Sequence, residues 1–165
     1  MIGSALRVAG AALACSMTLP AMAAEPSVVG AWKLVSYTRE DPATGASTLP
    51  WGEKAAGYLH LLPDGRMAVV ITAQGRQPAV RGEDGFIEKQ AKLFQTVTAY
   101  AGTYSTRGNA LTVRVEVAGL PEWVGTDQLR EFRLDGDSLT IRTAPMQSVS
   151  DGKTYVYVLS WKRVT

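Results

Sequence analysis

The stretch Gly30-Ala31-Trp32-Lys33-Leu34-Val35-Ser36-Tyr37 decides the fold of this chain. It places a Gly-x-Trp motif at the head of a segment in which side chains alternate in character, as they do in a half-buried β-strand. With strict alternation over 29–39, two faces form: Trp32, Leu34, Ser36 and Thr38 on one, and Lys33, Val35, Tyr37 and Arg39 on the other. We expect Trp32 to anchor the first strand of a small closed barrel.

Seven further segments with strand character follow at hairpin spacing. They are 57–62, 66–72, 101–106, 111–118, 128–134, 139–143 and 154–164. Tight-turn sequences such as Pro63-Asp64-Gly65 and Asp135-Gly136-Asp137 separate several of them. Short turns in meander order favour an all-β, eight-stranded, antiparallel up-and-down barrel. The interior of such a barrel is about wide enough for one small ligand.

The hydrophobic period changes once, between the third and fourth predicted strands. Phe86, Gln90, Leu93 and Val97 recur at helical spacing, and Asp84 is a candidate N-cap. This pattern predicts one helix over about 85–97. We expect its apolar face to cover one open end of the barrel.

The first residues have the character of a secretory signal peptide. An apolar, Ala-rich segment follows Arg7, and Ala21-Met22-Ala23 provides a small-x-small cleavage pattern. We therefore divide the chain into a signal peptide, 1–23, and a barrel domain, 24–165. This division predicts a periplasmic or secreted protein with no integral membrane segment after cleavage. Cys15, the only cysteine, lies in the signal, so we expect neither a disulfide nor a thiol nucleophile in the mature chain.

Charge argues against several classes of partner. The chain has 17 basic and 15 acidic residues, a net charge of +2 and one histidine, and the charges are interspersed. This distribution is not typical of nucleic-acid binding or of a polybasic membrane patch. We find no phosphate loop, zinc motif or dinucleotide fingerprint, and we expect no cofactor and no metal. The oligomeric state is not readable from the sequence.

Four motifs, taken in order, resemble the bacterial and fungal lipocalin-like domain family over about 28–165. They are Gly30-x-Trp32-x-Leu34-x-Ser36-Tyr37, Gly57-Tyr58 with Pro63-Asp64-Gly65, Tyr100-Ala-Gly-Thr-Tyr104, and Trp123-Val-Gly-Thr-Asp-Gln128. The resemblance implies a barrel with a cavity. It also implies that a basic residue of the last strand, Arg163 or Lys162, packs across Trp32, which gives Gly30, Trp32 and Arg163 structural roles. A His pair common in the family is replaced here by Val113 and Arg114.

Aromatic side chains supply the main evidence for a ligand site. Trp51, in the loop 46–55, and Tyr58, Tyr100, Tyr104 and Trp123 fall near the barrel end opposite Trp32. Met67 is expected in the wall of the cavity. Apolar walls with a few polar groups are typical of small-molecule sites. The alternative is that these side chains only fill the core.

Charged strand residues leave two questions open. Arg114 and Glu116 share one face of 111–118, while Leu111, Val113 and Val115 share the other, and either face can line the interior. Arg130 shares a face with Phe132. Its planar fork can bind a carboxylate, or it can lie on a solvated face.

Three functions are compatible with these patterns. The first is an exported barrel that binds a small, mainly hydrophobic molecule through Trp51, Tyr58, His60, Met67, Tyr100, Tyr104, Arg114, Trp123 and Arg130. The second is an isomerase-like or cyclase-like enzyme that uses His60, the single histidine, as acid or base together with Glu116. The third is a structural domain with a filled interior. The direction of the His60 side chain separates the first two, and we lean towards a binding protein.

Overall fold

The computed structural model of the protein describes residues 27–148 and 151–164. In chain order the elements are β1 (Gly30–Glu40), β2 (Ser47–Thr48), β3 (Ala56–Leu61), β4 (Arg66–Thr72), α1 (Phe86–Phe94), β5 (Val97–Arg107), β6 (Ala110–Ala118), the short 3-10 helix η1 (Pro121–Trp123), β7 (Asp127–Asp135), β8 (Ser138–Thr143), β9 (Met146–Gln147) and β10 (Thr154–Arg163). The predicted signal peptide, 1–23, lies outside the described residues.

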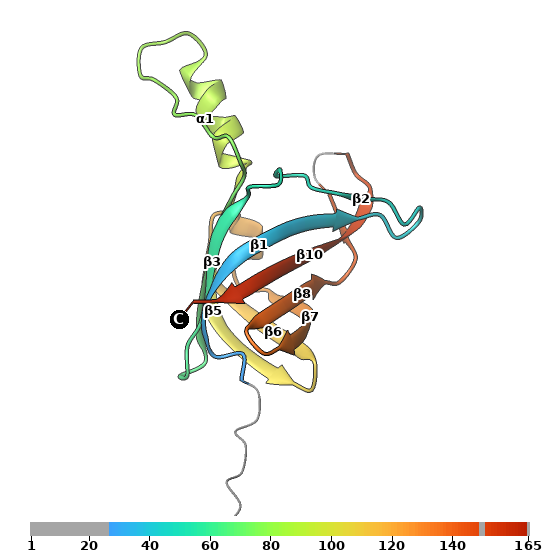
Figure 1. The fold of residues 1–165 in the computed structure, drawn as a ribbon. Helices are drawn as coiled ribbons and strands as arrows, with labels where there is room; N and C mark the ends of the chain where they lie inside the picture. The colour runs from blue at the N-terminus through green and yellow to red at the C-terminus, as the bar shows by residue number, and fades with distance from the viewer. Residues whose placement is uncertain (1–26, 149–150, 165) are drawn as a thin grey trace, which may run out of the picture.

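Eight of these strands form a closed antiparallel barrel. Strands β1, β3, β4, β5, β6, β7, β8 and β10 are hydrogen-bonded in this order, and β10 returns to pair with β1 from Trp32–Arg163 to Glu40–Val156 (Figure 1). Closure leaves none of these eight as a sheet edge. The short strand β2 pairs with the last residues of β1, and the short strand β9 pairs with the first residues of β10. The predicted eight-stranded antiparallel barrel is confirmed.

An aliphatic core fills the barrel where the strands alternate regularly. Its buried members include Leu34, Leu59, Leu61, Met67, Val69, Ile71, Leu111, Val113, Val115, Leu139 and Ile141, together with Trp32 and Trp161. The structure thereby answers the open question about 111–118. Leu111, Val113 and Val115 face the interior, and Arg114 and Glu116 are exposed on the outside.

Trp32 and Arg163 hold together the end of the barrel at which β1 begins. The Arg163 guanidinium lies 4.1 Å above the Trp32 ring and donates to the Val29 carbonyl at 2.7 Å. Gly30 adopts a φ of +145°, and a Cβ there would lie 2.6 Å from Nη1 of Arg163. The Gly-x-Trp motif is therefore a packing requirement, because the arginine occupies the space of a Gly30 side chain. Lys162, the alternative basic residue, is exposed.

Two β-bulges change which residues face inward. The pairing of β1 with β10 slips between Leu34 and Ser36, so strict alternation fails at Val35. Tyr37 consequently joins the core side, where Trp32 and Leu34 already lie, which corrects the alternation expected from the sequence. A second slip, between Ala101 and Gly102 of β5, makes Glu116 the extra residue of β6.

The helix lies between the third and fourth barrel strands, as predicted, but not against the barrel. None of its residues is buried, and Ile87 and Phe94 are 67% and 52% exposed. Figure 1 shows α1 standing away from the strands. The expectation that its apolar face covers a barrel end is wrong. No helix within the described ranges is long and apolar enough to cross a membrane.

The position of α1 follows from the hairpin that carries it. β5 begins at Val97, opposite Thr72, and not at residue 101 as expected. The pairing continues beyond the strands through the Ala73 amide, which donates to the Thr96 carbonyl at 3.0 Å. This extended pairing leads the connection away from the barrel before α1 begins. The N-cap of α1 is Gly85, not Asp84 as expected.

Candidate functional site

The two ends of the barrel differ in their connections. Tight turns join β3 to β4, β5 to β6 and β7 to β8 at the end that contains Trp32 and Arg163, which we call the closed end. The longer connections β1–β3, β4–β5, β6–β7 and β8–β10 meet at the other end, which we call the mouth. Binding residues of barrels are commonly carried by such loops, so the mouth is the expected place for a binding site.

Five aromatic residues, the mouth aromatics, lie together above the aliphatic core. They are Tyr37, Trp51, Tyr100, Trp123 and Tyr157. The Tyr37 ring lies 4.7 Å from Trp51 and 5.6 Å from Tyr157, and Tyr100 meets Trp123 edge-on at 5.5 Å, measured between centroids. All five are partly exposed, which distinguishes them from the fully buried Trp32.

Arg130 brings a positive charge to the inner side of the mouth. It pairs with Leu111 of β6 and Thr143 of β8, and residues directly opposite on antiparallel strands share a face. Because Leu111 is buried in the core, Arg130 also points inward. The sequence left this choice open, and the structure resolves it in favour of the interior.

Burial and the charge of Arg130 act in opposite directions on the pKa values of two tyrosine hydroxyls at the mouth. Burial raises the pKa of Tyr37 well above its ordinary value, the Tyr157 phenol raises it further, and the charges of Arg39 and Arg130 act in the opposite direction. Burial likewise raises the pKa of Tyr100, against the charge of Arg130 and a hydrogen bond from its side chain. Both phenols are therefore neutral hydrogen-bonding groups near neutral pH.

A second inward arginine, Arg39, already has an acidic partner. Its guanidinium lies 4.2 Å above the Tyr155 ring and 3.9 Å from Oδ2 of Asp151. The Tyr155 hydroxyl donates to the same carboxylate at 2.8 Å. This hydrogen bond lowers the pKa of Asp151, and Arg39 contributes in the same direction.

A hollow of about 300 Å³ opens beside Arg130. Strand β7 begins at Asp127, but its pairing with β8 ends at Arg130–Thr143, so its first residues extend past β8. The lining residues come from β7, the end of β8, the turn after it and β10: Leu129, Arg130, Glu131, Arg142, Thr143, Ala144, Pro145 and Val156. The hollow connects the outer surface to Arg130.

Four of the sequence-predicted residues lie on the outer surface: Tyr58, His60, Glu116 and Arg114. Tyr58 and His60 alternate with buried Leu59 and Leu61, and their rings face each other at 6.5 Å between centroids on the outside of β3. Glu116 is also exposed, on β6, with β4 and β5 between it and His60. The structure does not bring together the acid–base pair that the enzyme hypothesis needs.

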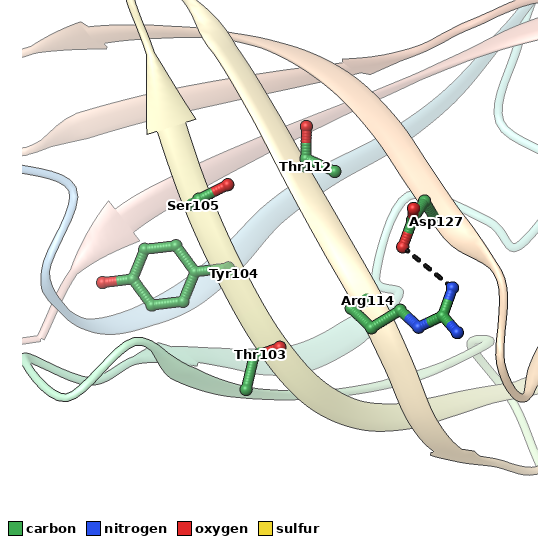
Figure 2. A pocket seen from close by; sticks show the side chains of 6 residues that line it. All are labelled: Thr103, Tyr104, Ser105, Thr112, Arg114 and Asp127. Carbon is green, nitrogen blue, oxygen red and sulfur yellow. Dashed lines mark hydrogen bonds and ion pairs between the residues drawn. The ribbon is translucent and has the colours of Figure 1, made fainter.

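Arg114 lies in a separate hollow of about 330 Å³ on the outer wall. Figure 2 shows its side chain reaching towards Asp127, at 3.3 Å, while the Tyr104 ring points away from this pair. The rest of the lining is Thr103, Ser105 and Thr112. Arg114 and Asp127 are both largely exposed, so water screens this ion pair and the groove holds no unpaired charge.

Two further predicted residues lie deeper than the mouth. Met67 is buried in the interior wall, as expected, opposite Leu61 and Gly102. Tyr104 lies at the closed end, where its hydroxyl donates to the Leu62 carbonyl at 2.9 Å. The expectation that Tyr104 is near the mouth is corrected, because β5 runs from the mouth at Val97 to the closed end at Arg107.

Sequence reasoning missed Tyr37, Arg39 and Tyr157 as mouth residues. Tyr37 was placed on the face opposite Trp32 because alternation does not reveal the bulge in β1. Tyr157 alternates with Tyr155, Leu159 and Trp161 along β10, and this period-two aromatic run was an available signal. No group of three or more His, Cys, Asp or Glu side chains that could hold a metal occurs within 27–148 and 151–164.

Comparison with known proteins agrees with the barrel described above. A family model described as a lipocalin-like domain matches residues 29–164, nearly the whole of the described chain. No curated protein matches the chain. With the closed barrel, the Trp32–Arg163 contact and this match in place, the chain belongs to the lipocalin-like domain family.

Proposed function

We propose that this protein is an exported lipocalin-like barrel that binds one small, mainly hydrophobic molecule in the mouth half of its interior. The observation that carries the proposal is the partial exposure of the mouth aromatics. They face inward from β1, β5, β10 and two connections, yet solvent reaches them. Inward rings that remain accessible offer apolar surface on which a small molecule can pack, whereas Trp32 is fully buried and offers none.

Binding is tested with N-phenyl-1-naphthylamine, a neutral apolar dye whose emission rises in apolar sites. We expect saturable binding of one dye per chain. Trp123→Ala removes a mouth aromatic and weakens binding several-fold, while the matched variant Tyr58→Ala, which truncates an exposed ring on the outer face of β3, has no effect. Absence of saturation, or equal weakening by both variants, contradicts the proposal.

Export is tested separately by the intact mass of the protein recovered from its own cells. A mature chain that begins at Ala24 or Glu25 is expected from the cleavage pattern. A chain that still begins at Met1 would refute export without affecting the binding proposal.

A further inference from the structure

Among the described residues, the Arg130 side chain forms hydrogen bonds only with neutral groups. Nη1 donates to the Leu129 carbonyl at 2.8 Å, and Nη2 donates to Oε1 of Gln128 at 3.0 Å. The Tyr100 hydroxyl is a further neutral partner. Within the described ranges no carboxylate lies within ion-pair distance of this guanidinium.

Among the described residues, five other arginines of the barrel have a carboxylate within 4 Å: Arg39 with Asp151, Arg66 with Asp64, Arg114 with Asp127, Arg142 with Glu40 and Arg163 with Asp137. Among the described residues that point into the mouth, Arg39 is thus paired and Arg130 is not. The difference is informative, because a partly buried cation without a counter-charge is costly unless another group supplies one.

The orientation of Arg130 is fixed from the mouth side. Gln128, which accepts from Nη2, donates through Nε2 to the Thr126 hydroxyl at 3.0 Å. Thr126 in turn donates to the Trp123 carbonyl at 2.7 Å. This chain of hydrogen bonds links the guanidinium to η1, which carries one of the mouth aromatics. A fixed guanidinium loses less conformational entropy when it binds an anion.

The surroundings of the hollow permit an anion to reach Arg130. Arg142, which also lines it, is bonded to Glu40 at 2.9 Å. Glu131, the one carboxylate of the lining, lies on the outward face of β7 opposite Arg142. On the interior side, Tyr37 is influenced by both Arg130 and Arg39, and Arg39 is paired with Asp151. The phenols of Tyr37 and Tyr100, which Arg130 approaches, are neutral.

We propose that the molecule bound in the mouth is an anionic amphiphile, with an apolar body against the mouth aromatics and one carboxylate or similar oxyanion on Arg130. This inference rests on the proposed function and adds the charge of the ligand to it. Guanidinium–oxyanion hydrogen bonds are about twice as strong as neutral ones. Arg130 therefore selects acids over neutral molecules of the same shape.

The test compares two dyes that differ by one charged group. 8-Anilinonaphthalene-1-sulfonate is N-phenyl-1-naphthylamine with an added sulfonate. Arg130→Gln is expected to weaken binding of the sulfonate about tenfold or more, and binding of the neutral dye less than about twofold. The matched control is Arg133→Gln, which removes the same charge from the outward face of the same strand. It leaves both affinities unchanged.

The outcomes separate the two proposals. If the neutral dye binds saturably and Arg130→Gln weakens both dyes equally, or neither, the anion proposal is overturned. Small-molecule binding then still stands. Failure of both dyes to bind the wild-type protein overturns both. If Arg130→Gln does not fold, Arg130→Lys is compared with Arg130→Met. Arg130→Lys keeps the charge but not the planar fork, so it must retain more sulfonate binding than Arg130→Met, and equal loss in these two variants refutes the proposal.

Discussion

The contact between Arg163 and Trp32 is the most direct link between the sequence motif and the fold. Arg163 covers the indole ring and donates to two backbone carbonyls of the segment before β1, those of Val29 at 2.7 Å and Ser27 at 2.9 Å. It therefore ties the last strand to the entrance of the first. Arg163→Met keeps apolar cover over Trp32 while removing the charge and all the donors.

The magnitude follows from the partial burial of the arginine. A partly desolvated cation–π contact contributes about 1–2 kcal/mol, and each of the two hydrogen bonds contributes about 1 kcal/mol after exchange with water. The contact with Asp137 at 3.5 Å adds little, because that carboxylate is half exposed. We expect Arg163→Met to lower the free energy of unfolding by about 3 kcal/mol.

Urea denaturation, followed by tryptophan fluorescence, measures this loss. The matched control is Arg142→Met, which breaks an ion pair with Glu40 whose side chains are 44% and 36% exposed. That pair is expected to contribute at most about 1 kcal/mol. If Arg163→Met costs no more than Arg142→Met, the last strand is not fastened through Trp32 and the reasoning fails.

Three further predictions concern the wall, the motif and pH. Leu61→Ala costs about 2–5 kcal/mol in urea denaturation, whereas its neighbour Leu62→Ala, 44% exposed, costs far less; similar losses contradict the assigned interior. Gly30→Ala lowers the urea midpoint through backbone strain at a φ of +145° and through contact with Arg163, so its cost is smaller in an Arg163→Ala background; equal losses in the two backgrounds contradict the packing role. The folded-state pKa of Asp151 is lowered, so its stabilisation holds above the unfolded value of 3.8 and fades as pH falls through the folded value. Between pH 5 and pH 3, Asp151→Asn loses less stability than the wild type; equal losses contradict this assignment.

Those parts of the fold that depend on local pattern could be predicted from the sequence. Gly30 and Trp32, with a basic residue near the end of the chain, predicted the closed end, and turn sequences predicted the hairpins. The helix was also found from its period. Its placement was not, because the spacing of apolar residues indicates that a face exists and not what it packs against. Ile87 and Phe94 remain exposed for this reason.

The candidate site was less predictable, since it depends on two long-range features. A bulge is a property of two paired strands, so the sequence of β1 alone cannot show that Tyr37 turns inward. The inward direction of Arg130 is likewise set by its registration with Leu111. By contrast, Trp51, Tyr100 and Trp123 were predicted near the mouth, because loops and strand ends limit where large aromatic residues can lie.

Native mass spectrometry of the protein purified from its own cell extract tests the central claim most directly, since it requires no choice of probe. Small-molecule binding at the mouth predicts a population heavier than the bare mature chain by the mass of one small molecule. Trp123→Ala should reduce this population, and Tyr58→Ala should not. Only the mass of the bare chain, in repeated preparations under conditions that preserve weak complexes, would contradict the account.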